Sequence, residues 1–229
     1  MKKKIFCVIP AQEKNNYSNS GDLCPWGEST LLEWKISQLQ DVKYIKEIYV
    51  YTDSRKIINF LKNKRNIKIF LRKNNSDISK SYQEVGKKFK NIHILWANCT
   101  CPFVSKKVVI DLIKSYRKSN FYKDGIVTSQ KQKEYFFDKN GPINKFLVKK
   151  KILSRKYISA FYKISNGLFL SHSSNYINGA PFGDKPIHFL VNWITSLEIK
   201  NIFEMNLYSG LISNYLFGSV LWPAIFDST

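Results

Sequence analysis

The sequence predicts an α/β protein with a doubly wound, mostly parallel sheet. Short apolar runs alternate with segments of helical period over residues 5–129, which is the pattern of parallel strands joined by crossover helices. The runs at residues 5–9 and 91–97 are almost continuously apolar, as strands buried on both faces of a sheet are. In this fold class the crossovers are right-handed and ligands bind at the carboxyl ends of the strands.

The first strand is expected at residues 5–9, between a lysine-rich start and a proline. A polar loop then leads to a helix at residues 30–42, for which Ser29 and Thr30 are capping candidates. The helix has apolar residues at helical spacing: Leu31, Leu32, Ile36 and Leu39. The loop therefore leaves the carboxyl end of a strand, where a ligand site is expected.

Three more strand–helix pairs follow the same pattern. Strands are expected at residues 47–52, 67–71 and 91–97, and helices at residues 55–64, 79–89 and 106–119. The strand NIHILWA at 91–97 is the most apolar and is expected at the centre of the sheet. A strand at residues 125–129 ends the regular alternation.

The pattern changes after residue 129. Residues 130–165 are basic and rich in aromatic side chains, and a turn at 138–142 predicts a hairpin, a small insertion or a dimerisation segment. A strand at 167–171, a turn at 180–186 and a helix from Leu197 to about Leu216 are expected to follow. The apolar residues 218–229 are expected to pack on the body or on a second subunit. We treat residues 1–229 as one domain.

The formal net charge is +20, from 37 Lys and Arg against 17 Asp and Glu. Such an excess attracts polyanions such as nucleic acid, an anionic membrane or a phosphate-rich substrate. The lysines are scattered in short groups, and lysine, asparagine, isoleucine and tyrosine are plentiful together, which is typical of an AT-rich genome. We interpret the charge as mainly compositional, and no specific nucleic acid partner is expected.

Several features indicate a cytoplasmic protein. The opening apolar run of about six residues is too short for a signal peptide, and no stretch has 18 uncharged apolar residues to cross a membrane. Cys7, Cys24, Cys99 and Cys101 lack the spacing of a zinc site, so free buried thiols are expected. His93 lies in an apolar run and is expected in the core.

Four motifs lie at or next to the ends of predicted strands. They are Pro10-Ala11 with the later PWGESTLLEWKISQL, then YTDS at 51–54, NCTCP at 98–102 and NGLF at 166–169. The segments GDKPI and SLEI come after them. In this order they resemble the cytidylyltransferases that activate sialic acids and related 3-deoxy-2-keto sugar acids as CMP-sugars. The resemblance covers nearly the whole chain and implies the nucleotide-diphospho-sugar transferase fold, which is Rossmann-like and GT-A-like.

The resemblance implies transfer of CMP from CTP to the anomeric hydroxyl of a sugar acid, with release of pyrophosphate. Positioning and electrostatics supply most of the catalysis of such a reaction. In the family, the loop after the first strand gives backbone N–H groups and basic side chains to the phosphates. The segment before the last helix gives acidic ligands to Mg²⁺, which prefers oxygen ligands.

By the same resemblance, Gln12 and Lys14 are expected near the phosphates and Glu198 at Mg²⁺. The residues expected to bind nucleotide or sugar are Ala11, Asp53, Arg72, Ser81, Asn98, Asn166 and Lys185. Asp53 has an alternative role, which is to cap the next helix together with Ser54.

The chain departs from the family at two places. The family loop begins Ala-Arg-Gly-Gly-Ser-Lys, whereas Gln12 stands at the arginine and the glycines are absent. Lys14 and Asn15 correspond either to a later Lys-Asn pair or, through Lys14, to the first lysine. Lys200 stands where the family has a second acidic ligand. These departures favour an alternative, a non-catalytic relative that has lost phosphate and metal binding. A glycosyltransferase is disfavoured because no Asp-x-Asp ends a central strand.

Overall fold

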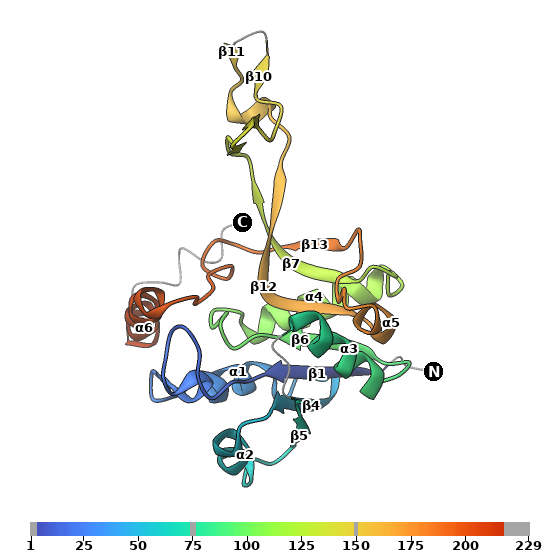
Figure 1. Ribbon diagram of the computed structural model, residues 1–229, viewed down its shortest axis with the longest axis vertical. Helices are drawn as coiled ribbons and strands as arrows, with labels where there is room; N and C mark the ends of the chain where they lie inside the picture. Colours follow the sequence, from blue (N-terminus) through green and yellow to red (C-terminus); the bar gives the residue numbers. More distant parts are fainter. Residues whose placement is uncertain (1–3, 74–76, 149–150, 218–229) are drawn as a thin grey trace.

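The computed structural model describes residues 4–73, 77–148 and 151–217. Seven strands form one sheet in the order β13-β7-β12-β6-β1-β4-β5 (Figure 1). Their bounds are β1 Ile5–Pro10, β4 Ile45–Thr52, β5 Ile67–Leu71, β6 His93–Ala97, β7 Ile126–Gln132, β12 Phe161–His172 and β13 Ile187–Leu190. Strand β12 runs antiparallel to both of its neighbours, and the other pairs are parallel. The predicted mostly parallel sheet is confirmed, with β6 at its centre.

Six α-helices connect or flank the strands in the described part of the chain. They are α1 Leu31–Leu39, α2 Arg55–Leu61, α3 Ile78–Lys88, α4 Lys106–Lys118, α5 Ser173–Ile177 and α6 Ile202–Phe217. Side chains cap the first four, because Thr30, Ser54, Asp77 and Ser105 each accept a backbone N–H of the first turn. Thr30 and Glu33 form a full capping box at α1. Short polar residues before each apolar pattern therefore fix where these helices begin.

Two apolar clusters cover the two faces of the sheet, as a doubly wound fold requires. Along β1 the side chains alternate: Ile5, Cys7 and Ile9 belong to one cluster and Val8 to the other. The first cluster includes buried residues of α1, α2, α4 and α6, and the second those of α3 and α5. The helices thus sandwich the sheet and leave its two strand-end edges open to ligands.

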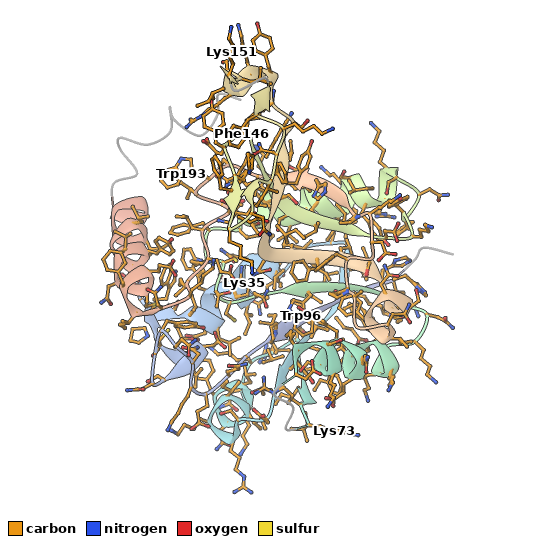
Figure 2. The ribbon with its side chains drawn as sticks, turned by 45° about the horizontal axis from the view of Figure 1, so that its top comes forward. Lys35, Lys73, Trp96, Phe146, Lys151 and Trp193 are labelled. Atoms are coloured by element: carbon orange, nitrogen blue, oxygen red, sulfur yellow. The ribbon has the colours of Figure 1, made fainter. Side chains whose placement is uncertain are left out.

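An arm projects from the body where β7 and β12 continue beyond the other strands (Figure 1). It carries two small hairpins, β8 Phe137–Asp138 with β9 Gly141–Pro142 and β10 Leu147–Val148 with β11 Lys151–Ile152. Phe146 is only 2% exposed inside the arm and its ring lies 4.9 Å from that of Tyr135 (Figure 2). The predicted turn at 138–142 lies between β8 and β9, and the arm has packing of its own.

Some predicted bounds differ from the structure. The last helix begins at Ile202 rather than near Leu197, because Ile199 is drawn into the core and its N–H bonds Thr100 O at 2.8 Å. Strand β12 begins six residues before the predicted residue 167 because its first part pairs with β7 in the arm. Strand β13 and helix α5 were not predicted. The prediction for residues 218–229 lies outside the described residues.

Minor elements complete the described chain. Strands β2 Pro25–Trp26 and β3 Ser29–Thr30 form a small hairpin after the first loop, and 3-10 helices occur at Gly21–Leu23 and Arg155–Tyr157. In the residues described, no helix has the length and apolar character needed to span a bilayer.

Candidate active site

A cavity of about 290 Å³ opens at the carboxyl ends of β1, β4 and β6. Strands β1 and β6 contribute Gln12 and Asn98 just after they end, and β4 contributes Tyr51 near its end. These residues meet because parallel strands end at the same edge. Four residues predicted from the sequence line it together: Gln12, Arg72, Ser81 and Asn98. Tyr51 and Trp96, both almost fully buried, supply apolar walls. We call this space the first cavity.

The loop after β1 is closed by the buried carboxylate of Asp22. Its Oδ2 accepts the backbone N–H of Gln12 at 2.7 Å, and its Oδ1 accepts the Tyr17 hydroxyl. The Asp22 N–H in turn donates to Gln12 O at 2.9 Å. At Gly21, with φ of +54°, a Cβ would lie 2.0 Å from Gln12 O, so this crossing of the loop requires glycine. Burial raises the pKa of Asp22 to about 6, against the opposing effect of the Tyr17 and Gln12 hydrogen bonds.

The loop after β1 therefore brings little positive charge to the first cavity. The Gln12 N–H, which the family resemblance assigns to phosphate, already bonds an internal carboxylate. Lys14 is exposed and does not line the first cavity. Glu13 bonds Ser54 Oγ at 2.9 Å and Lys56 Nζ at 2.8 Å instead. Neither Asp22 nor Tyr17 was predicted from the sequence. The Gly21-Asp22 pair in a loop was the one sequence feature that could have indicated Asp22.

Arg72 is the only cation among the described residues that line the first cavity. Asp53 holds it through two bonds, Nε to Oδ2 at 3.2 Å and Nη2 to Oδ1 at 2.8 Å, which is the bidentate geometry that orients a guanidinium. Asp53 itself does not line the cavity. The capping of α2 falls to Ser54, whose Oγ accepts Ile57 N–H at 3.2 Å. Asp53 therefore orients Arg72 and does not cap the helix.

A chain of amides runs from Asn98 to Glu198. Trp96 Nε1 donates to Asn98 Oδ1 at 2.9 Å, Asn98 Nδ2 donates to Asn166 O, and Asn166 Nδ2 donates to Glu198 Oε1 at 2.8 Å. Asn166 is presented by a bulge in β12, since Ile164 pairs with Ser129 but Phe169 pairs with Val127. Such bulges re-aim side chains near functional sites.

Thr128 holds this bulge in place. Its Oγ1 donates to Ser165 O at 2.8 Å and accepts Leu168 N–H at 3.1 Å. Gly167 lies within it, and a Cβ there would come 2.9 Å from Val104 Cγ2. The glycine of the NGLF motif therefore lets the bulge approach the loop after β6.

Glu198 lines a second cavity, of about 240 Å³, on the far side of Asn166. Gln130, Lys163, Trp193 and Lys200 are among its walls. The Lys200 ammonium lies 3.8 Å from Glu198 Oε2, so both oxygens of this carboxylate have neighbours. Figure 2 labels the exposed Trp193 near the base of the arm. The amide chain thus connects two separate cavities.

Two more of the predicted residues line neither cavity, in addition to Lys14, Asp53 and Asn166. Lys185 precedes β13, which runs parallel to β7 and begins beside Ile126, so it lies at the amino ends of the strands and on the opposite edge. Ala11 is fully buried and its N–H donates to Tyr51 O at 3.0 Å, which joins the start of the loop to β4. The structure does not bring Lys185 to either cavity.

Side chains of helix α1 hold the loop after β6 through hydrogen bonds to its backbone carbonyls. Lys35 is 1% exposed and its Nζ donates to Cys101 O at 2.8 Å (Figure 2). Trp34 Nε1 donates to Pro102 O at 2.7 Å. Burial lowers the pKa of Lys35. All four cysteines are buried free thiols, as predicted, and burial raises the pKa of Cys101 to about 12, which favours the protonated thiol.

The described residues contain no group of three or more His, Cys, Asp or Glu side chains arranged for a metal. Mg²⁺, however, is commonly held by one or two carboxylates together with phosphate oxygens. Glu198 is such a carboxylate at a cavity wall, and the chemistry of its oxygens fits that role. A divalent cation bound there would displace the Lys200 ammonium.

The fold is an α/β sandwich with a cavity at the carboxyl ends of its parallel strands, and comparison with known proteins identifies its family. The family model for cytidylyltransferases matches residues 23–173. The chain belongs to the cytidylyltransferase family. Among curated protein sequences there is no match.

Solved structures share the fold at low sequence identity. A CMP:2-keto-3-deoxy-manno-octonic acid synthetase complexed with CTP superposes with a TM-score of 0.70 and 11% identity, covering 93% of this chain and 100% of that one. A 4-diphosphocytidyl-2C-methyl-D-erythritol synthase from Anaerococcus prevotii has a TM-score of 0.64 and 16% identity, covering 93% and 97%. The predicted fold class and family are confirmed.

Proposed function

We propose that this cytidylyltransferase transfers CMP from CTP to a sugar acid of the 3-deoxy-2-keto or sialic acid type. The observation that supports it is the pair of cavities joined by Asn98, Asn166 and Glu198. Transfer of CMP from CTP to a sugar acid needs two anionic substrates held next to each other, and linked cavities of this kind fit that requirement. The acceptor hydroxyl oxygen forms a bond to the α-phosphorus, the bond to pyrophosphate breaks, and the hydroxyl proton passes to water.

In this proposal CTP occupies the first cavity. Arg72, oriented by Asp53, neutralises phosphate charge, and Asn98 and Ser81 offer polar groups to the nucleoside. Gln12 donates through its side-chain amide, because its backbone N–H is engaged by Asp22. Lys14 is exposed and reaches the phosphates only from the solvent side.

The sugar acid occupies the second cavity. Lys163 and Lys200 provide positive charge for its carboxylate, Gln130 provides an amide, and the 59% exposed Trp193 provides an apolar face for the sugar ring. This role for Lys200 explains its departure from the family pattern, since a cation there serves the acceptor.

Mg²⁺ is proposed to be held by Glu198 and substrate phosphate oxygens, and when bound it neutralises phosphate charge. Glu198→Gln keeps the bond from Asn166 but removes the carboxylate. We expect CTP to stabilise this variant equally with and without Mg²⁺, whereas the wild type responds more strongly with Mg²⁺. Equal Mg²⁺ dependence in both proteins would place the metal elsewhere.

Thermal shift with CTP, followed by pyrophosphate release, tests the function. CTP at about 100 times its Kd should raise Tm by about 5–10 °C, and UTP, ATP and GTP should do less. Pyrophosphate should then appear only with a sugar acid, and not with the methyl ester of the same sugar. A protein that responds to no triphosphate would instead be the non-catalytic relative that the departures in the loop favour.

The arm is proposed to form a homodimer. It exposes large apolar side chains, among them Phe137, Ile152 and Tyr157 at 61–69%, which a second copy would cover. We also propose that the enzyme works in the cytoplasm. Its four buried cysteines are free thiols, as proteins of a reducing compartment have.

A further inference from the structure

The edge of the sheet opposite the active site carries a basic groove. Strands β1, β4 and β6 begin here, and two adjoining cavities of about 410 and 480 Å³ both include Lys4 in their walls. Since β1 has six residues, this edge lies about 20 Å from the first cavity. We define the basic groove by the lysines and the arginine that line it: Lys4, Lys43, Lys46, Arg117 and Lys123. His93 and His172 are among its other walls.

No acidic residue balances this charge within the groove. Neither cavity has an Asp or Glu among its lining residues in the described chain. The acids next to these cations in sequence are committed elsewhere or face away: Glu47 pairs with Lys68 at 3.0 Å, and Asp124 packs against the Gly183 turn. None of the groove's lysines or arginine forms an ion pair in the described residues.

Two of the cations share one aromatic ring. Lys43 Nζ lies 5.3 Å and Arg117 Cζ 5.0 Å from the centroid of the Tyr44 ring. Each contact is favourable by itself, but two positive charges held around the same ring repel each other. An anion bound between them would offset that repulsion, so the groove is arranged for a negatively charged ligand.

The aromatic surfaces of the groove are already in contact with protein groups. The Tyr44 ring meets two cations, and the Phe121 and His93 rings lie 4.7 Å apart. Base stacking on open ring faces, which single-strand binding proteins use, is therefore not the main interaction. Polar side chains also line the groove: Asn91, and Ser174, whose hydroxyl bonds His172 Nδ1 at 2.9 Å. Amide and hydroxyl groups of this kind suit phosphate oxygens.

We propose that the basic groove binds a linear chain of closely spaced phosphates, independently of the active site and of the proposed function. Inorganic polyphosphate and the backbone of single-stranded nucleic acid share this chemistry. The net charge of +20 draws such polymers to the protein from a distance, and the two adjoining cavities give the chain a path along the sheet edge.

The test compares two double variants that change net charge equally. Lys4→Glu with Lys43→Glu alters the groove, and Lys62→Glu with Lys87→Glu alters exposed lysines outside it. Fluorescence anisotropy would follow labelled polyphosphate, labelled oligothymidylate and labelled polyglutamate. We expect the groove variant to bind the phosphate polymers about tenfold more weakly and with a salt slope lower by about 1.5, while the control pair changes less than about twofold.

Each outcome decides the proposal. Weaker binding of both phosphate polymers by the groove variant supports the proposal, and weaker binding of only one of them supports it and identifies the source of the phosphates. Equal losses in both double variants, equal binding of polyglutamate, or no binding by the wild type would overturn it. Unchanged melting temperature and CTP response show that the groove variant is folded with its active site intact.

Discussion

Arg72 and Asp22 bring opposite charges to the first cavity, and each is held in place by its hydrogen-bond partners. Arg72 is fixed by the two oxygens of Asp53, so its orientation costs little on ligand binding. Asp22 is held by the Tyr17 hydroxyl and the Gln12 N–H, which satisfy a carboxylate that burial would otherwise disfavour. Under the proposed function, we expect the balance between these two charges to set the affinity of the first cavity for CTP.

Arg72→Met is expected to weaken CTP binding by about tenfold or more, because a charge-assisted contact contributes about 1.5–3 kcal/mol. Isothermal titration calorimetry would measure it. Arg65→Met, an exposed arginine outside the cavity, is the matched control and should bind as the wild type does. Equal affinity of the two variants would exclude Arg72 from the phosphate site.

Asp22 makes stability depend on pH. Its pKa is raised from 3.8 to about 6 in the fold, so the folded state favours the protonated acid. This stabilisation is complete below pH 3.8 and is lost as pH rises through 6. Urea unfolding at several pH values should show the wild type losing about 3 kcal/mol relative to Asp22→Asn between pH 4 and 7.5. A difference that does not change with pH would mean that Asp22 titrates normally.

At the scale of elements, side-chain caps made helix starts predictable. Thr30 and Ser54 stand directly before the apolar patterns that they cap. The late start of α6 had a similar signal, since Asn201 Oδ1 accepts the Glu204 N–H at 2.9 Å. The bulge in β12 had none, because it depends on Thr128, a residue about 40 positions away. The periodicity of apolar residues reports local structure and does not predict contacts between distant segments.

The arm offers a test at the same scale. Ile152→Glu should convert a dimer to a monomer, because it places a charge on a 66% exposed apolar side chain of β11 that a partner would bury. Multi-angle light scattering gives the mass. Leu71→Glu, at 62% exposure on the far edge strand, is the control and should leave the mass unchanged. A wild type that is already monomeric at micromolar concentration would exclude the arm dimer.

For the whole molecule, sequence predicted the sheet, its centre and four of the residues in the first cavity. The sheet came from the alternation of apolar strands with helical segments, and the four cavity residues came from the resemblance to the cytidylyltransferase family. The same resemblance placed Lys185 with them, but Lys185 lies at the opposite edge of the sheet, because β12 reverses direction and the next strand starts from that edge. It also missed Asp22 and Tyr17, whose roles follow from how one loop folds back on itself.

The arm also has a hydrodynamic consequence. A compact chain of 229 residues has a radius of gyration of about 17 Å, and a rigid projection adds mass far from the centre. Small-angle X-ray scattering of the monomer should therefore give a larger radius and an asymmetric distance distribution with a long tail. Gel filtration calibrated on spherical standards will overestimate its mass, so an early-eluting monomer will resemble a dimer unless its mass is measured directly.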